Sequence, residues 1–133
     1  MKTKPNNEEV LGVKAPERAY DSDYHSPKCP FTGTLKVKNE VLRGKVVKKD
    51  INHSATIEWS RSRQVPKYER FEIRRSRLRV HNPAAVDAQI GDEVIVARTR
   101  PLSKTKNHVI IGVVGVTKPT PKTKEEINET SKE

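Results

Sequence analysis

Five short runs of β-type residues, separated by turn signals, constrain the fold of this chain more than any other feature. The clearest is residues 54–60, in which Ala55, Ile57 and Trp59 alternate with polar residues, as in a strand with one buried face. The other runs are residues 41–50, 69–80, 93–98 and 109–116, of which the last is nearly all apolar. Five short strands within about 75 residues predict an all-β fold, namely a small closed or partly open barrel.

The third run changes phase along its length. Phe71 and Ile73 lie on one face of the expected strand, whereas Leu78 and Val80 lie on the other. Such a change is typical of a β-bulge or a sharp bend, so we expect one between the two pairs. We also expect Phe71 and Trp59 to be buried in the core, the latter because it shares a face with other apolar residues.

Two connections carry recognisable signals. Asn82 and Pro83 open a short segment that we expect to hold one helical turn. Gly91 and Asp92 then predict a tight turn into the fourth strand. In the first run, Gly44 marks a bend.

The distribution of charge narrows the choice among barrels. The chain has 27 Lys and Arg against 17 Asp and Glu, a net charge of +10. Residues 1–28 and 118–133 are each neutral, so the whole excess lies in residues 29–117, where 18 basic residues face 8 acidic ones. A cationic folded part predicts a polyanion as partner, and it favours a five-stranded barrel of the oligonucleotide-binding (OB) type over the SH3-like alternative.

The two neutral ends differ from the central part in pattern. Residues 1–28 have no sustained period, and we expect them to form an N-terminal extension that stays mobile until it binds RNA. Residues 118–133 are rich in Lys, Glu, Thr and Pro, which predicts a disordered C-terminal tail. Residues 29–117 remain as the OB-fold, RNA-binding domain.

Two segments carry most of the candidate RNA contacts. Residues 61–79 hold eight basic residues against two glutamates, and seven of the eight are arginine, whose planar guanidinium suits phosphate. Residues 98–108 join two apolar runs and carry five basic side chains with no acid. A solvated surface that happens to be basic is the alternative to a nucleic-acid interface. The side chains that we expect to contact RNA are Arg43, Lys45, Lys48, Lys49, Arg61, Arg63, Lys67, Tyr68, Arg70, Arg74, Arg75, Arg77, Arg79, His81, Asn82, Arg100, Pro101, Ser103, Lys104, Thr105 and Lys106.

Enzymatic and metal-binding sites have little support in the sequence. The single cysteine, Cys29, has only His25 near it, and two ligands do not make a zinc site, so we expect a small buried side chain. A phosphate-binding P-loop needs glycines, and none occurs between Arg98 and Ile111. We therefore expect no enzyme, no cofactor and no small-molecule substrate. The absence of a long apolar run and of a signal-like N-terminus predicts a cytoplasmic protein without membrane contact.

Several motifs together resemble one family. They are GDEVIVARTRPLS (residues 91–103), CPFTGTL (29–35), VPKYERFEIRRSR (65–77), VHNP (80–83) and RPLSKTK (100–106). In this order and spacing they resemble the small-subunit ribosomal protein seventeen family (uS17 type), in its archaeal and eukaryotic branch. The sequence departs from the family pattern at Arg98 and at HSATIEW (residues 53–59).

The resemblance implies a structural role in the small ribosomal subunit during assembly and translation. A protein of this family is expected to have an OB-type barrel and to clamp helices in the 5′ domain of small-subunit rRNA beside neighbouring ribosomal proteins. It implies that residues 100–106 and 61–79 reach into RNA. A free-standing RNA- or tRNA-binding OB module, or an RNA chaperone, is the alternative function.

Overall fold

The computed structural model describes residues 3–116, with the side chain of Val116 left aside. Its elements are β1 (Glu9–Val10), β2 (Val13–Lys14), two 3-10 helices η1 (Glu17–Tyr20) and η2 (Ser22–Tyr24), β3 (Val37–Asp50), β4 (Ser54–Val65), the 3-10 helix η3 (Pro66–Tyr68), β5 (Arg70–His81), β6 (Asp92–Thr99) and β7 (His108–Val116). Within this part of the chain, no helix has the length and apolar character needed to cross a bilayer. The tail predicted at residues 118–133 lies outside the described residues.

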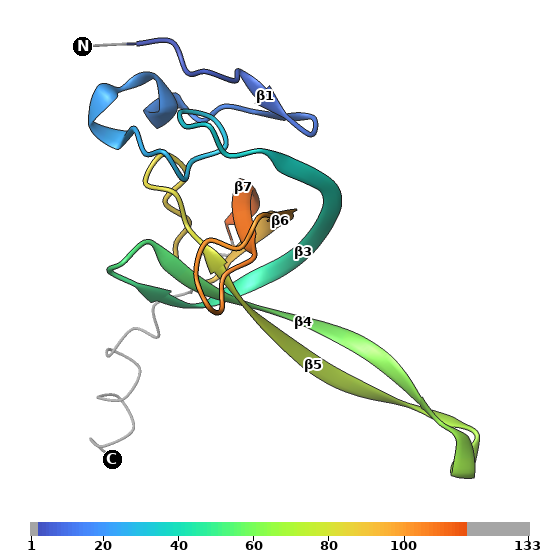
Figure 1. The fold of residues 1–133 in the computed structure, drawn as a ribbon. Helices are drawn as coiled ribbons and strands as arrows, with labels where there is room; N and C mark the ends of the chain where they lie inside the picture. The colour runs from blue at the N-terminus through green and yellow to red at the C-terminus, as the bar shows by residue number, and fades with distance from the viewer. Residues whose placement is uncertain (1–2, 117–133) are drawn as a thin grey trace, which may run out of the picture.

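β3 to β7 form a closed barrel in the order β3-β4-β5-β7-β6 (Figure 1). The long strand β3 pairs with β4 through its C-terminal half and with β6 through its N-terminal half, which closes the sheet on itself. β5 and β7 run parallel and meet at His81 and Val109, whereas the other barrel pairs are antiparallel. The predicted all-β, OB-like barrel is confirmed, and all five predicted strands are present.

The barrel interior is filled by aliphatic side chains from its strands. Ile57, Val80, Val94, Val96 and Ile110 are all fully buried there. Trp59 is partly buried and packs against this cluster, in agreement with the prediction. The strands approach closely at Gly44, where a Cβ atom would lie 3.2 Å from the carbonyl oxygen of Glu58. A glycine at this position therefore lets β3 curve tightly around the core.

The N-terminal segment covers the outer face of β6 and β7. Val109 and Ile111 in β7 point away from the barrel interior and are buried beneath Val10 and Val13 of the small β1–β2 hairpin. The fit is close, because a Cβ atom at Gly112 would lie 2.7 Å from Cγ1 of Val13. Figure 1 shows this segment on the side of the barrel away from the projecting part of β4 and β5. Residues 109–111 of β7 are therefore buried on both faces, which explains why they are apolar at consecutive positions.

The same segment builds a second core beside the barrel. Ala19, Cys29, Phe31 and Ala85 are fully buried together, so Cys29 is a buried side chain as expected. The mobility that we expected of residues 1–28 before RNA binds stays a prediction, and the described residues 3–28 pack against the rest of the fold through both clusters. Their few apolar side chains are spaced without a period because they serve two separate clusters.

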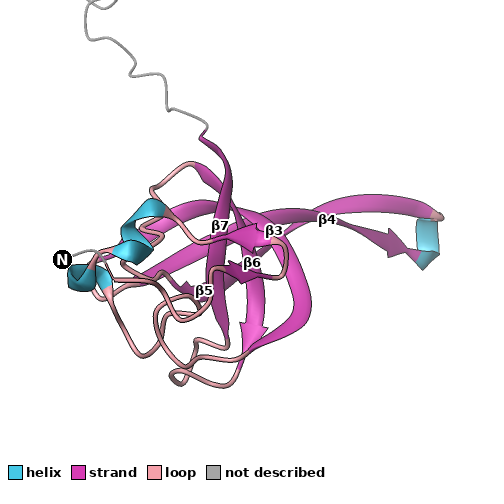
Figure 2. Cartoon of the chain, turned by 90° about the horizontal axis from the view of Figure 1, so that it is seen from above, coloured by secondary structure: helices cyan, strands magenta, loops and turns pink. Residues whose placement is uncertain are grey.

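β4 and β5 extend far beyond the barrel as a two-stranded hairpin (Figures 1 and 2). Their register is unbroken from Ser54–His81 to Val65–Arg70, so of the two alternatives that we gave for β5, a β-bulge or a sharp bend, the bulge is wrong. The irregularities lie instead in β3 and in the β6–β7 pair. Phe71 is 73% exposed rather than buried, because it lies beyond the barrel edge, where neither hairpin face is covered.

The two predicted connections are confirmed. The amides of Val86 and Asp87 both donate to the carbonyl of Pro83, which gives one helical turn. Gly91 adopts a φ of +96° at the turn into β6, a conformation that favours glycine.

Candidate nucleic-acid interface

OB barrels bind oligonucleotides on the face of their second and third strands and with the loops after strands one and four. In this barrel those elements are β4, β5, the turn 51–53 and the loop 100–107. The loop meets the start of β4, because Nζ of Lys106 donates to Oγ of Ser54 at 3.0 Å. Loop and hairpin therefore border one continuous surface.

The loop 100–107 is closed on itself by its backbone. The amide of Leu102 donates to the carbonyl of Lys106 at 2.9 Å, and the amide of Lys106 donates to Oγ of Ser103 at 3.1 Å. Arg100, Lys104 and Thr105 are exposed, as are Pro101 and Ser103. The cations are thus presented from a loop whose shape is fixed before any ligand arrives, which lowers the entropy lost on binding.

Positive charges crowd around Lys106. Burial lowers the pKa of its ammonium, and the charges of Lys28 and Arg79 lower it further, while Asp50 acts in the opposite direction. An anion that binds beside Lys106 would stabilise its charged form, because it offsets the repulsion from the neighbouring cations. Lys28 was not among the residues that we predicted, because its segment seemed to lie apart from the domain.

His81 and Asn82 do not lie on this surface, contrary to our expectation that they contact RNA. Asn82 is 2% exposed, and its amide group bonds the backbone of Ala88 through both its nitrogen and its oxygen. His81 is 5% exposed. Burial, together with the charges of Lys106 and His53, lowers the pKa of His81 to about 4, so its ring is neutral at pH 7.

Four of the hairpin arginines already have acidic partners inside the chain. Nε of Arg77 donates to Glu58 at 2.8 Å, and Arg75 lies 3.9 Å from the same carboxylate. Arg79 pairs with Asp50 and Arg74 with Glu72, each at 2.6 Å. The cluster is less unbalanced than the sequence suggested, because strand pairing brings Asp50 of β3 and Glu58 of β4 beside arginines of β5, and Glu72 lies within β5 itself.

The other hairpin cations have no ion pair among residues 3–116. These are Arg61, Arg63, Lys67 and Arg70, and all of them are exposed. The ammonium of Lys67 lies over the ring of Tyr68, 5.5 Å from its centroid. A polyanion would meet these charges without first displacing a carboxylate.

Two rows of side chains cross β3, β4 and β5 on the outer surface of the barrel. Strand register aligns Lys45 with Glu58 and Arg77, and it aligns Lys48 with Thr56 and Arg79. The basic members of both rows are exposed, as is Arg43 one step along β3. The rows thus connect the barrel wall with the base of the hairpin.

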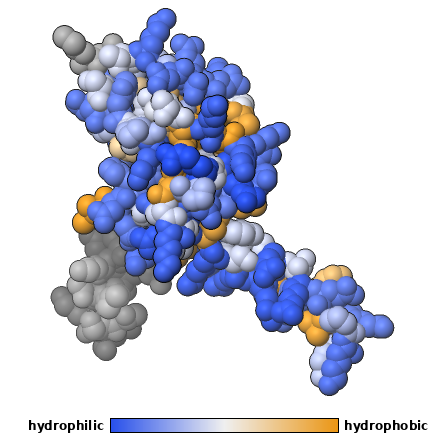
Figure 3. Space-filling view, in the orientation of Figure 1, coloured by the Kyte–Doolittle hydropathy of each residue, from blue (hydrophilic) through white to orange (hydrophobic). Residues whose placement is uncertain are grey.

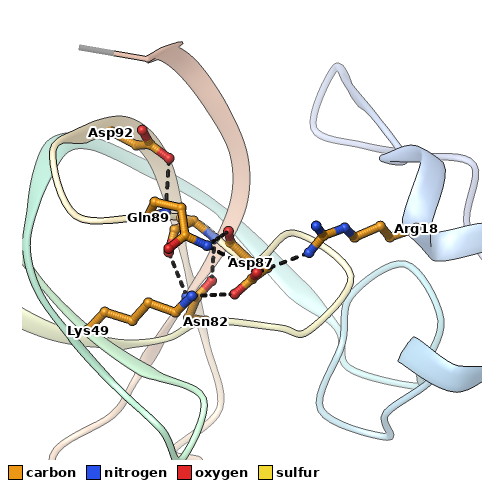
Figure 4. A network of polar contacts seen from close by, with 7 residues as sticks. Arg18, Lys49, Asn82, Asp87, Gln89 and Asp92 are labelled. Carbon is orange, nitrogen blue, oxygen red and sulfur yellow. Dashed lines mark hydrogen bonds and ion pairs between the residues drawn. The ribbon is translucent and has the colours of Figure 1, made fainter. Parts of the chain in front are cut away.

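Lys49, which we predicted to contact RNA, already has an acidic partner inside the chain. Its ammonium lies 2.6 Å from Oδ1 of Asp87, whose Oδ2 accepts from Arg18 of η1 at 3.0 Å (Figure 4). Lys49 and Arg18 lower the pKa of the Asp87 carboxyl against the opposing effect of its burial. This network joins β3, the connection 82–91 and the N-terminal segment, so we assign it to the fold.

A further cationic hollow was missed by the sequence interpretation. Lys36 and Lys38, before and at the start of β3, line a cavity of about 570 Å³. Arg98 at the end of β6 and Arg100 at the start of the loop 100–107 line the same cavity. Arg98, which we took to be unbalanced, pairs with Glu40 of β3 at 3.0 Å. The alternating Lys-Val-Lys of residues 36–38 was the available signal, since it places both lysines on one side of the chain.

The described residues 3–116 hold no group of three or more His, Cys, Asp and Glu side chains arranged to bind a metal ion. What the surface offers chemically is positive charge and hydrogen-bond donors on rigid elements.

Comparison with known proteins gives a consistent result. The sequence model of the family described as ribosomal protein S17 matches residues 44–112. The small ribosomal subunit protein uS17 of Methanopyrus kandleri is 47% identical over 104 residues, which cover 78% of this chain and 85% of that protein. Its counterparts in Archaeoglobus fulgidus and Haloarcula marismortui are 47% and 42% identical, over 79% and 78% of this chain and 90% and 89% of those proteins.

Proposed function

Because the chain belongs to the ribosomal protein S17 family, we propose that it is a structural constituent of the small ribosomal subunit and binds the subunit's rRNA. It acts in this role without catalysis, on the ribosome, beside other small-subunit proteins. Its similarity to archaeal relatives extends beyond residues 44–112, so it includes more of the chain than the family model matches.

The observation that supports RNA binding most strongly is the continuity of the loop 100–107 with the hairpin. Lys106 and Ser54 join the two, and the rows on β3, β4 and β5 extend the same cationic surface along the barrel wall. A surface that extends from a loop onto a long hairpin fits two neighbouring RNA helices better than one single strand. The protein therefore clamps structured RNA, and it contacts mainly phosphate and ribose.

We further propose that the rRNA bound is the 5′ domain, and that residues 29–117 form the RNA-binding domain. Of the contacts that we predicted, the exposed cations Arg43, Lys45, Lys48, Arg61, Arg63, Lys67, Arg70, Arg100 and Lys104 come first. Arg74, Arg75, Arg77 and Arg79 come second, because each has to share or exchange a carboxylate. Lys36 and Lys38 join the set because they line the cavity beside the loop, and Lys28, just before this domain, joins it because its charge acts on Lys106.

The test compares binding to two RNAs. The full chain is titrated against a transcript of the small-subunit rRNA 5′ domain and against an unrelated structured RNA of equal length, at several salt concentrations. We expect tight binding that survives moderate salt for the 5′ domain alone. Equal binding to both RNAs, lost together as salt rises, would indicate the free-standing RNA-binding module instead, as would release from small subunits in high-salt sedimentation.

A further inference from the structure

The apolar residues of β5 change sides where the hairpin leaves the barrel. Leu78 and Val80 face the barrel core, whereas Phe71 and Ile73 lie at positions of the opposite parity. Because the β4–β5 register has no irregularity, alternation places the two pairs on opposite faces of one ribbon. The projecting part of the hairpin thus has an apolar side of its own, unrelated to the barrel core.

At these two positions that side is uncharged and uncovered, and Arg75 follows on the same side toward the barrel. Phe71 is 73% exposed and Ile73 is 80% exposed, and their partners across the ribbon are Gln64 and Ser62. Figure 3 shows apolar atoms near the far end of the hairpin, surrounded by hydrophilic ones. An isolated ribbon that only carried charges into solvent would gain nothing from exposing two large apolar side chains side by side.

The opposite face of the same stretch is cationic. Strand register pairs Arg61 with Arg74, Arg63 with Glu72 and Val65 with Arg70 on that face. Tyr68, Phe71 and Arg70 line a shared hollow at the tip, where the two faces meet. Between positions 61 and 75 the chain holds six basic and two acidic residues, which favours a polyanion as occupant over another protein surface.

We propose that Phe71 and Ile73 pack against unpaired nucleobases of the RNA while the cationic face contacts phosphates on the other side. Bases offer the apolar surface of an RNA, and they stack on aromatic side chains once they are splayed out of a helix. This inference rests on the proposed function, because it assigns a task to one part of the same interface.

The test uses the full chain and the double variant Phe71→Thr/Ile73→Thr, since threonine keeps the strand propensity of the ribbon. Val114→Thr in β7, where the valine is 50% exposed, is the matched control for loss of an exposed apolar side chain. The dissociation constant for the 5′-domain transcript is measured at several salt concentrations. We expect the double variant to bind about 5- to 140-fold more weakly at every concentration, as for the loss of one stacked base.

The slope of log K against log salt separates this contact from a charge contact. We expect the double variant to keep the wild-type slope, whereas Arg61→Ala lowers its magnitude by about 0.7–0.9. Dimethyl sulfate probing of the bound RNA gives a second readout. One or two bases should change reactivity in the double variant, while the hydroxyl-radical footprint on the backbone stays as in the wild type.

Two results would overturn the proposal. One is a double variant with wild-type RNA affinity, and if that variant also fails to enter small subunits, the occupant is a protein. The other is a double variant whose slope falls as that of Arg61→Ala does, with unchanged base reactivity. If the wild-type protein bound both RNAs alike, the proposed function would fail. In that case, a loss of RNA affinity in the double variant that does not depend on salt would still show that these residues contact bases.

Discussion

Glu58 offers the sharpest test of how the arginines of the hairpin are used. Its carboxylate lies 2.8 Å from Arg77 and 3.9 Å from Arg75, and its side chain is 19% exposed. Both arginines are exposed at their outer ends, so a phosphate can approach them while Glu58 remains in place. The carboxylate then sits behind the guanidinium groups and repels the incoming anion. We therefore expect Glu58→Gln to bind RNA more tightly.

The magnitude follows from the geometry. A phosphate on the far side of the Arg77 guanidinium lies about 7 Å from the Glu58 carboxylate, which gives about 0.6 kcal/mol of repulsion in water and more nearer the protein. Removal of that charge should tighten binding about two- to fivefold at low salt, and the advantage should shrink as salt rises. The magnitude of the salt slope should increase by at most about 0.7–0.9. Loss of two exposed ion pairs should cost less than about 1 kcal/mol of stability per pair.

The assay is a titration of the 5′-domain transcript with wild type, Glu58→Gln and the charge-matched control Glu9→Gln. Glu9 lies in β1, which Figure 1 places on the other side of the barrel from the hairpin. The control should leave affinity and slope nearly unchanged. Weaker binding by Glu58→Gln, with an intact fold, would refute the reasoning. It would mean that the carboxylate orients the arginines rather than competing with phosphate.

Two further predictions concern the fold. Gly112→Val should lower the free energy of unfolding by about 1–3 kcal/mol, because its side chain would collide with Val13, whereas Gly115 has free space and its Val variant should cost less. Urea titration compares them, and equal losses would contradict the packing of the N-terminal segment on β7. Burial and Lys106 hold the pKa of His81 at about 4, below its usual 6.5, so its contribution to stability is complete above pH 6.5. It should be lost as the pH falls from 6.5 towards 4, by up to about 3 kcal/mol, and a wild-type pH profile in His81→Gln would refute this.

The strands were predictable because alternation and turn residues act locally. Residues 54–60 alternate because one face meets the barrel core, and Gly91 marks a turn that needs a positive φ. Phe71 was misjudged by applying the same rule beyond the barrel, where an apolar residue no longer implies a core. The phase change in β5 does mark a change in the strand, but its cause is that the strand leaves the barrel, so that its apolar residues no longer face the core.

Contacts between distant segments left little trace in the sequence. Asp87 pairs with Lys49, which is 38 residues away, and nothing local to either residue indicates it. Asn82 looks like any polar residue after a strand, although its amide group bonds the backbone of Ala88 inside the fold. The covering of β7 did leave a signal, since residues 109–111 are apolar at consecutive positions and so require burial on both faces. Which exposed cations touch RNA stays a prediction.

Because the register of β4 and β5 is unbroken, the number of residues in the two strands sets both the length of the hairpin and the face to which each side chain points. Each added residue lengthens a strand by about 3.4 Å and turns every later side chain to the other face. A change of one residue in each strand would therefore turn Phe71 and Ile73 to the face that now carries Arg61 and Arg74. A change of two residues in each would move the tip by about 7 Å and keep both faces intact. Hairpins of related length should thus differ in steps of two residues per strand, with the RNA they reach spaced accordingly.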